Sequence, residues 1–152
     1  MNVYTDTSAI GGCFDIEFKE WSLALIDEFV AGAKKLVLSD LTIRELGLAR
    51  DEVRYKIDDI PIENRILVNI NDEAIHLAET YIREGALTNK SYDDALHIAL
   101  ATLNKADVLA SWNFKHIVNL ERIRHYNSIN LRLGYMVIEI RSPREILKPT
   151  NK

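Results

Sequence analysis

Short apolar runs alternate with longer amphipathic segments along the chain. The apolar runs have the length and composition of buried β-strands, and they fall at residues 2–6, 36–38, 65–70, 106–112 and 137–140. Between them, apolar residues recur at helical spacing, which predicts helices over residues 16–34, 42–57, 72–85, 91–104 and 118–133. Strands that alternate with helices in this way predict a mostly parallel central sheet covered by helices on both faces, a three-layer α/β/α fold.

Polar residues at the predicted helix starts give a second local signal. Thr42 and Glu45 stand at the spacing of a capping box, and Ser91 and Asp94 have the same spacing with Asp in place of Glu. Asn71 directly precedes another predicted helix and is a favoured N-cap residue. We therefore expect Ser91 and Asn71 to be N-caps and a capping box to open the helix at Thr42.

Length and composition favour one globular domain. A chain of 152 residues with 47% hydrophobic and 28% charged residues can bury a substantial core, and we expect a single domain over residues 1–147 with a short tail at 148–152. A net charge of −4 argues against a generic basic nucleic-acid coat. No apolar run approaches the roughly 18 residues of a membrane span, no signal peptide is evident, and Cys13 is alone. We expect a cytoplasmic protein without a membrane partner.

Acidic and amide side chains stand close to the predicted strand ends. Asp6 ends the first strand, Glu45 follows the second by about one helical turn, and Asp94 opens the helix before the fourth strand, which itself leads to Asn113. Ligands of parallel α/β folds bind beyond the carboxyl ends of the strands. Carboxylates that meet there repel each other unless one takes up a proton or a cation binds. Hard oxygen ligands without cysteine suit Mg²⁺ or Mn²⁺.

Four segments in this order resemble the PIN-domain family, which includes the VapC-like toxin ribonucleases of bacterial toxin–antitoxin pairs. The segments are Val3-Tyr4-Thr5-Asp6-Thr7-Ser8, Glu45, Asp94-Ala95-Leu96-His97-Ile98-Ala99 and Ala110-Ser111-Trp112-Asn113-Phe114-Lys115-His116. The resemblance covers nearly the full length and implies a parallel sheet between helices. It also implies a metal-dependent endoribonuclease that hydrolyses RNA phosphodiester bonds with Mg²⁺ or Mn²⁺, an antitoxin protein as a partner, and a homodimer.

The resemblance also assigns the site residues. Asp6, Glu45 and Asp94 match the family's metal-binding acids, and the fourth acid of the catalytic set falls at Asn113. Asparagine offers a neutral oxygen but neither a negative charge nor a proton acceptor of carboxylate strength. This departure implies reduced activity, dependence on one metal ion, or no activity. Hydroxyl groups are expected to steady the acids or bound water, namely those of Thr7 or Ser8, and of Ser111.

Three alternatives stand beside this interpretation. Because of Asn113, the chain could be a weakened PIN-like domain that binds RNA or a protein partner without cleaving. His97, one turn after Asp94, could bind metal or be a buried, hydrogen-bonded histidine. Finally, Glu73 with His76 and Asp94 with His97 have the carboxylate-x-x-His spacing of di-iron helical bundles. The apolar runs between the helices count against a bundle.

Overall fold

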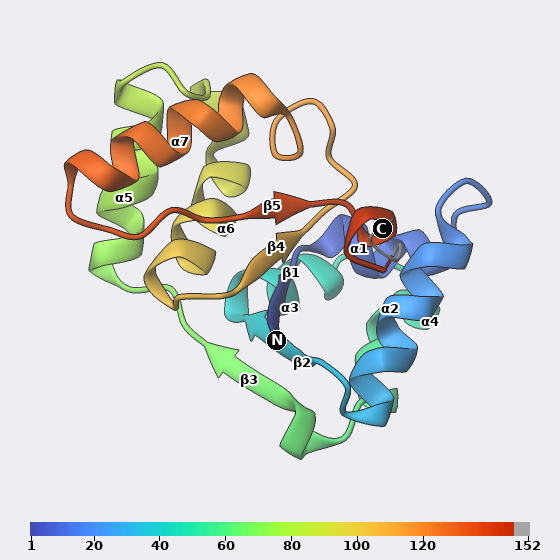
Figure 1. Ribbon diagram of the computed structural model, residues 1–152. Helices are drawn as coiled ribbons and strands as arrows, with labels where there is room; N and C mark the ends of the chain where they lie inside the picture. Colours follow the sequence, from blue (N-terminus) through green and yellow to red (C-terminus); the bar gives the residue numbers. More distant parts are fainter. Residues whose placement is uncertain (148–152) are drawn as a thin grey trace, which may run out of the picture.

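A parallel sheet forms the centre of the molecule. The computed structural model describes residues 1–147, and within them five strands pair in the order β3-β2-β1-β4-β5 (Figure 1). All four pairings are parallel, which confirms the predicted sheet. The strands are β1 (Asn2–Thr5), β2 (Lys35–Ser39), β3 (Arg65–Val68), β4 (Val108–Ala110) and β5 (Ile140–Arg141).

Helices cover both faces of the sheet. One layer holds α5 (Asp72–Arg83), α6 (Tyr92–Leu103) and α7 (Leu120–Arg132). The other holds α1 (Thr7–Gly11), α2 (Lys19–Ala31), α3 (Asp40–Leu46), α4 (Asp51–Tyr55) and α8 (Pro143–Leu147). Short 3-10 turns complete the described chain at Gly12–Phe14, Lys56–Asp59, Ile62–Asn64 and Asn89–Ser91. Figure 1 shows the sheet between these two groups of helices, as a three-layer fold requires.

Alternation along β1 sends its side chains into two separate cores. Tyr4 packs with α5, α6 and α7, whereas Val3 packs with α2 on the opposite face. Both side chains are completely buried. Strands buried on both faces consist of nearly continuous apolar residues, which is why short apolar runs located them in the sequence.

Two of the three predicted helix starts are confirmed in position, and the one at Thr42 differs. Asn71 caps α5, since its Oδ1 accepts a hydrogen bond from Ala74 N at 2.8 Å. The capping box at Thr42 is wrong, because α3 begins at Asp40 and Ser39 Oγ accepts from Thr42 N. Ser91 occupies the predicted N-cap position of α6, but its side chain makes no capping bond, so the capping box with Asp94 does not form.

The last strand is shorter and later than the predicted 137–140. Asn127, on α7, occupies both backbone groups of Ile138: its Nδ2 donates to the carbonyl at 3.0 Å and its Oδ1 accepts from the N–H at 2.8 Å. A side chain therefore replaces a neighbouring strand at this position, and β5 begins at Ile140. The expected tail, residues 148–152, lies outside the described residues. Across residues 1–147 no helix is both long and apolar enough to cross a membrane.

Gly12 marks a close approach between the segments that follow β1 and β4. A Cβ at this position would lie 2.4 Å from Ser22 Oγ and 2.6 Å from Trp112 Nε1. These two atoms are hydrogen-bonded to each other, with Trp112 Nε1 donating to Ser22 Oγ at 2.8 Å. Ser22 Oγ in turn donates to Ala9 O at 2.6 Å. Position 12 thus has no room for a side chain beside this buried network.

Candidate metal centre

Asp6 follows β1 directly and is held by three hydrogen bonds. Its Oδ1 accepts from Ala9 N at 3.0 Å, which makes Asp6 the N-cap of α1, and from Ser8 Oγ at 2.8 Å. Its Oδ2 accepts from Ser111 Oγ at 2.6 Å. The residue is 4% exposed, and burial raises the pKa of its carboxyl group, although these hydrogen bonds and the charge of His97 oppose the rise.

Glu45 approaches from α3 and is held through one oxygen. Thr7 Oγ1 donates to Glu45 Oε1 at 2.6 Å, and His97 Nε2 lies 2.7 Å from the same oxygen. Burial acts to raise the pKa of this carboxyl group, but the hydrogen bond and charge of His97 outweigh it, so the pKa is lowered. Glu45 therefore stays ionised more readily than an ordinary glutamate.

Asp94 lies in the first turn of α6 and is partly buried. Burial raises the pKa of its carboxyl group; the charges of His97 and His116 oppose this rise, and those of Asp6 and Glu45 add to it. Asp94 therefore lies close enough to both other acids to feel their charge. We call Asp6, Glu45 and Asp94 the acid cluster.

Asn113 lies in the segment after β4, and its side chain holds its own loop. The carboxamide Oδ1 accepts from the backbone N–H groups of His116 at 2.9 Å and Lys115 at 3.2 Å. The backbone N–H of Asn113 donates to Ser111 Oγ at 2.9 Å, and this hydroxyl also contacts Asp6. Asn113 is thus connected to the acid cluster through Ser111, while its own oxygen serves the turn.

Known structures share this architecture, whereas neither family models nor curated proteins match the sequence. VapBC2 from Rickettsia felis, bound to a DNA fragment from its promoter, aligns with a TM-score of 0.59 over 93% of this chain and 98% of that chain, at 14% identity. FitAcB from Neisseria gonorrhoeae gives 0.59 over 93% and 97%, at 13% identity. A toxin–antitoxin complex from Klebsiella pneumoniae gives 0.55 over 75% and 88%, at 16% identity.

The chain has a PIN-like fold. The parallel sheet and the helical layers on both of its faces agree with the expectation drawn from the four sequence segments. At these identities the likeness establishes the fold alone.

The acid cluster of this PIN-like fold has the donor chemistry of a hard divalent cation. All three side chains offer carboxylate oxygens, and burial makes the charge of two of them unfavourable, a cost that a bound cation would remove. Within residues 1–147, no three His, Cys, Asp or Glu side chains are grouped closely enough to hold an ion. Coordination by all three acids would therefore require their carboxylates to lie closer together than they do here.

The hydroxyl groups expected beside the acids are present. Thr7 contacts Glu45, while Ser8 and Ser111 both contact Asp6. His97 is the buried, hydrogen-bonded histidine of the two alternatives considered, with its Nδ1 2.7 Å from the hydroxyl of Tyr4. Tyr4 was not predictable as a partner of His97, because an aromatic residue in a short strand is usually a core residue.

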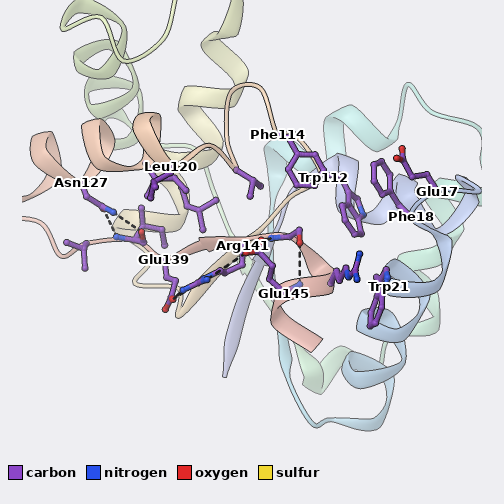
Figure 2. Close-up of a pocket in the computed structure, with 17 residues that line it drawn as sticks. Glu17, Phe18, Trp21, Trp112, Phe114, Leu120, Asn127, Glu139, Arg141 and Glu145 are labelled. Atoms are coloured by element: carbon purple, nitrogen blue, oxygen red, sulfur yellow. Dashed lines mark hydrogen bonds and ion pairs between the residues drawn. The ribbon is translucent and has the colours of Figure 1, made fainter. Parts of the chain in front are cut away.

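A groove of about 940 Å³ lies along β5 and the segment after β4 (Figure 2). Figure 2 shows Phe18, Trp112 and Phe114 at one end, where the rings of Phe18 and Trp112 stack with centroids 4.1 Å apart. The described residues that line the groove do not include the acid cluster. The neighbours of Asn113 on both sides therefore face a different surface from the acids.

Proposed function

We propose that this protein is a metal-dependent endoribonuclease that hydrolyses RNA phosphodiester bonds, acting as the toxin of a toxin–antitoxin pair. The observation that carries the proposal is the placement of the acids: Asp6 follows β1 and is held by Ser8 and Ser111, and Glu45 follows β2 and is held by Thr7 and His97. Asp94 lies in the first turn of α6, one helical turn before His97. The PIN-like fold and the resemblance of the surrounding segments support the proposal.

Asp6 and Asp94 are the proposed ligands of Mg²⁺ or Mn²⁺, with Glu45 as a further ligand or a partner of a bound water. A cation at this position supplies charge neutralisation for the phosphodiester and lowers the pKa of water. The protein's part is to keep the carboxylates ionised and oriented. Ser8 and Ser111 hold Asp6, and the lowered pKa of Glu45 keeps its charge available.

Asn113 is the fourth position of the proposed catalytic set. Its oxygen is engaged by two backbone N–H groups of its own loop, so we assign it to holding the segment that carries Ser111. A neutral side chain here favours a centre with one tightly bound cation over a centre with two.

Cleavage of RNA by the purified full chain tests the proposal. We expect Mn²⁺-dependent internal cleavage that a chelator abolishes and that Asp94→Asn reduces at least about 100-fold, since a ligand of the cation is lost. Asp93→Asn is the matched control, because Asp93 is the neighbouring residue, is exposed, and lies 3.7 Å from Arg44 at the surface. Equal cleavage by wild type and Asp94→Asn would reject the proposed site.

The proposed partners follow from the same function. The Klebsiella pneumoniae structure is a toxin–antitoxin complex, which supports an antitoxin protein as a partner for this chain. RNA as substrate, a homodimeric state and a cytoplasmic location are proposed with it from the resemblance of the sequence segments. Co-expression with a short neighbouring gene tests the antitoxin: its product should co-purify and suppress cleavage.

One observation favours a second function. The engagement of Asn113 with its own loop supports a PIN-like domain that binds RNA or a protein partner without cleaving. RNA binding that is retained in Asp94→Asn, together with no cleavage by wild type at any Mn²⁺ concentration, would favour this alternative.

A further inference from the structure

A chain of buried polar groups leads from the core to Glu45. Ser39 Oγ lies 2.8 Å from Tyr4 OH, Tyr4 OH lies 2.7 Å from His97 Nδ1, and His97 Nε2 lies 2.7 Å from Glu45 Oε1. Ser39 and Tyr4 are fully buried and His97 is 3% exposed. The four residues come from β2, β1, α6 and α3, so this row of hydrogen bonds joins four elements around the acid cluster.

The hydrogen positions in this chain are constrained by Glu45. An ionised carboxylate only accepts hydrogen bonds, so His97 Nε2 must carry the proton that lies between them. In a neutral imidazole, Nδ1 is then an acceptor and Tyr4 OH donates to it, while the tyrosine oxygen accepts from Ser39 Oγ. If the ring is doubly protonated, Nδ1–H donates to the Tyr4 oxygen and Tyr4 OH donates to Ser39 Oγ, whereas Nε2–H still donates to Glu45. Either way, His97 donates to Glu45.

The two oxygens of Glu45 are therefore not equivalent. Thr7 and His97 both donate to Oε1, and no other described residue donates to the carboxylate. Oε1 thus has its hydrogen bonds from the protein, and Oε2 is the oxygen that remains for a cation or a water. The exposed fraction of the side chain is 27%, so it would be free to change rotamer without these two donors.

We propose that His97 is a positioning residue for Glu45, held in place by Tyr4 and Ser39, and that it presents Oε2 of Glu45 to the cation site. This inference rests on the proposed function, because it assigns a cation to the acid cluster. Groups that orient metal ligands in this way change metal affinity by about 10- to 100-fold. His97 acts through Glu45 and touches neither the cation nor the substrate.

Mn²⁺ titration of the full chain by calorimetry, with four variants, tests the proposal. We expect His97→Leu to weaken Mn²⁺ affinity about 10- to 100-fold, since it removes the donor to Oε1. His97→Gln should stay within about threefold of wild type, because its amide N–H can replace Nε2–H. Tyr4→Phe should weaken affinity less than His97→Leu. Tyr81→Phe is the control, since it removes another fully buried tyrosine hydroxyl, bonded to Asn130.

A double-mutant cycle separates positioning from general destabilisation. If Tyr4 acts through His97, Tyr4→Phe should weaken Mn²⁺ binding in the wild type and have no effect in the His97→Leu background. Two-bond ¹H–¹⁵N correlation spectra of the metal-free protein provide a readout without metal, and should show a proton on Nε2 of His97.

Each outcome decides the proposal. Equal Mn²⁺ affinity of wild type and folded His97→Leu, an equally large loss in His97→Gln, or a neutral His97 ring protonated only on Nδ1 would overturn the positioning role while the proposed function stands. If His97→Leu does not fold, Tyr4→Phe against Tyr81→Phe decides. Absence of Mn²⁺ binding by the wild type would overturn the proposed function and this inference with it, even with the Nε2 proton in place.

Discussion

Ser111 Oγ donates a hydrogen bond to Asp6 Oδ2 at 2.6 Å across 105 positions of sequence. β1 and β4 are neighbours in the sheet, and each of these residues directly follows its strand. The hydroxyl also accepts the backbone N–H of Asn113. One serine thus joins an acid of the proposed cation site to the loop of the fourth predicted site residue.

Ser111→Ala should weaken Mn²⁺ binding about tenfold, because Asp6 loses the donor that orients Oδ2. This hydrogen bond also lowers the pKa of Asp6, so its loss raises that pKa further and shifts the onset of Mn²⁺ binding to higher pH. Calorimetric titrations across a pH series measure both effects. Ser142→Ala, which removes another buried hydroxyl near the end of β5, should leave the onset unchanged.

Asp6→Ala should reduce Mg²⁺ and Mn²⁺ binding by at least about 100-fold, because hard cations need anionic oxygen ligands. Asp40→Asn is the control, because it removes a carboxylate at the end of another strand, outside the acid cluster. Asp40 also follows a central strand, but its carboxylate accepts from Ile70 N and serves the connection to β3. Calorimetry measures both variants, and equal binding by Asp6→Ala and wild type would remove Asp6 from the ligand set.

Asp94→Asn should stabilise the metal-free protein at pH 7, because the ionised carboxylate is unfavourable in the folded state. The folded-state pKa of Asp94 is raised above its ordinary value of 3.8, so ionisation costs stability as pH rises through the raised pKa. The difference between variant and wild type should therefore shrink as pH falls toward 3.8. Urea unfolding at several pH values measures it.

Saturating Mn²⁺ should reverse the order of the same two proteins. A ligand at about 100 times its Kd stabilises the protein that binds it by about 2.7 kcal/mol, and Asp94→Asn should gain far less than the wild type. Asp93→Asn should follow the wild type in both conditions. If Asp94→Asn is less stable than wild type in the absence of metal, the electrostatic account of Asp94 is contradicted.

Asn113→Asp should increase Mn²⁺ affinity and raise RNA cleavage at limiting Mn²⁺, because a negative ligand joins the cluster with little change in size. The turn should survive, since both backbone N–H donors contact Oδ1, and aspartate supplies an equivalent acceptor. The metal-free protein should become less stable from added repulsion. Unchanged or lower affinity and cleavage would show that position 113 serves only the loop.

Gly12→Ala should destabilise the fold by about 1–3 kcal/mol, because the new Cβ would lie 2.4 Å from Ser22 Oγ, inside the buried network with Trp112. Gly11→Ala is the matched change one residue earlier, where no atom lies within 4 Å of the new Cβ. In α1 it should be neutral or stabilise by up to about 1 kcal/mol. Thermal unfolding should therefore show a lower Tm for Gly12→Ala and an unchanged or higher Tm for Gly11→Ala.

The strands were the most predictable part of the fold. Leu36, Val37 and Leu38 are buried on both faces of the sheet, and a short apolar run of this kind can be recognised from the local sequence alone. The last strand was misplaced because its start depends on Asn127, a residue of α7 that occupies the backbone of Ile138. No local pattern around residue 138 contains that information.

Local signals failed where a side chain had a tertiary partner. Glu45 has capping-box spacing to Thr42, yet its carboxylate contacts Thr7 and His97, while Ser39 caps the helix. The hydroxyl groups beside Asp6 were predictable because they follow the same strand ends. The link between Tyr4 and His97 was not, since 93 positions separate them and both residue types are ordinary in a core.

The strand order also governs when the acid cluster can form during synthesis. β1 is made first, but it lies between β2 and β4, and β4 ends only at Ala110. Asp6 and Glu45 therefore leave the ribosome well before Ser111 and His97 can hold them. Because a domain folds as a unit, a nascent chain that stops short of β4 carries all three acids but lacks Ser111 and one of the two strands that pair with β1. A ribonuclease built on this topology would remain inactive on the ribosome that makes it until most of its chain has emerged.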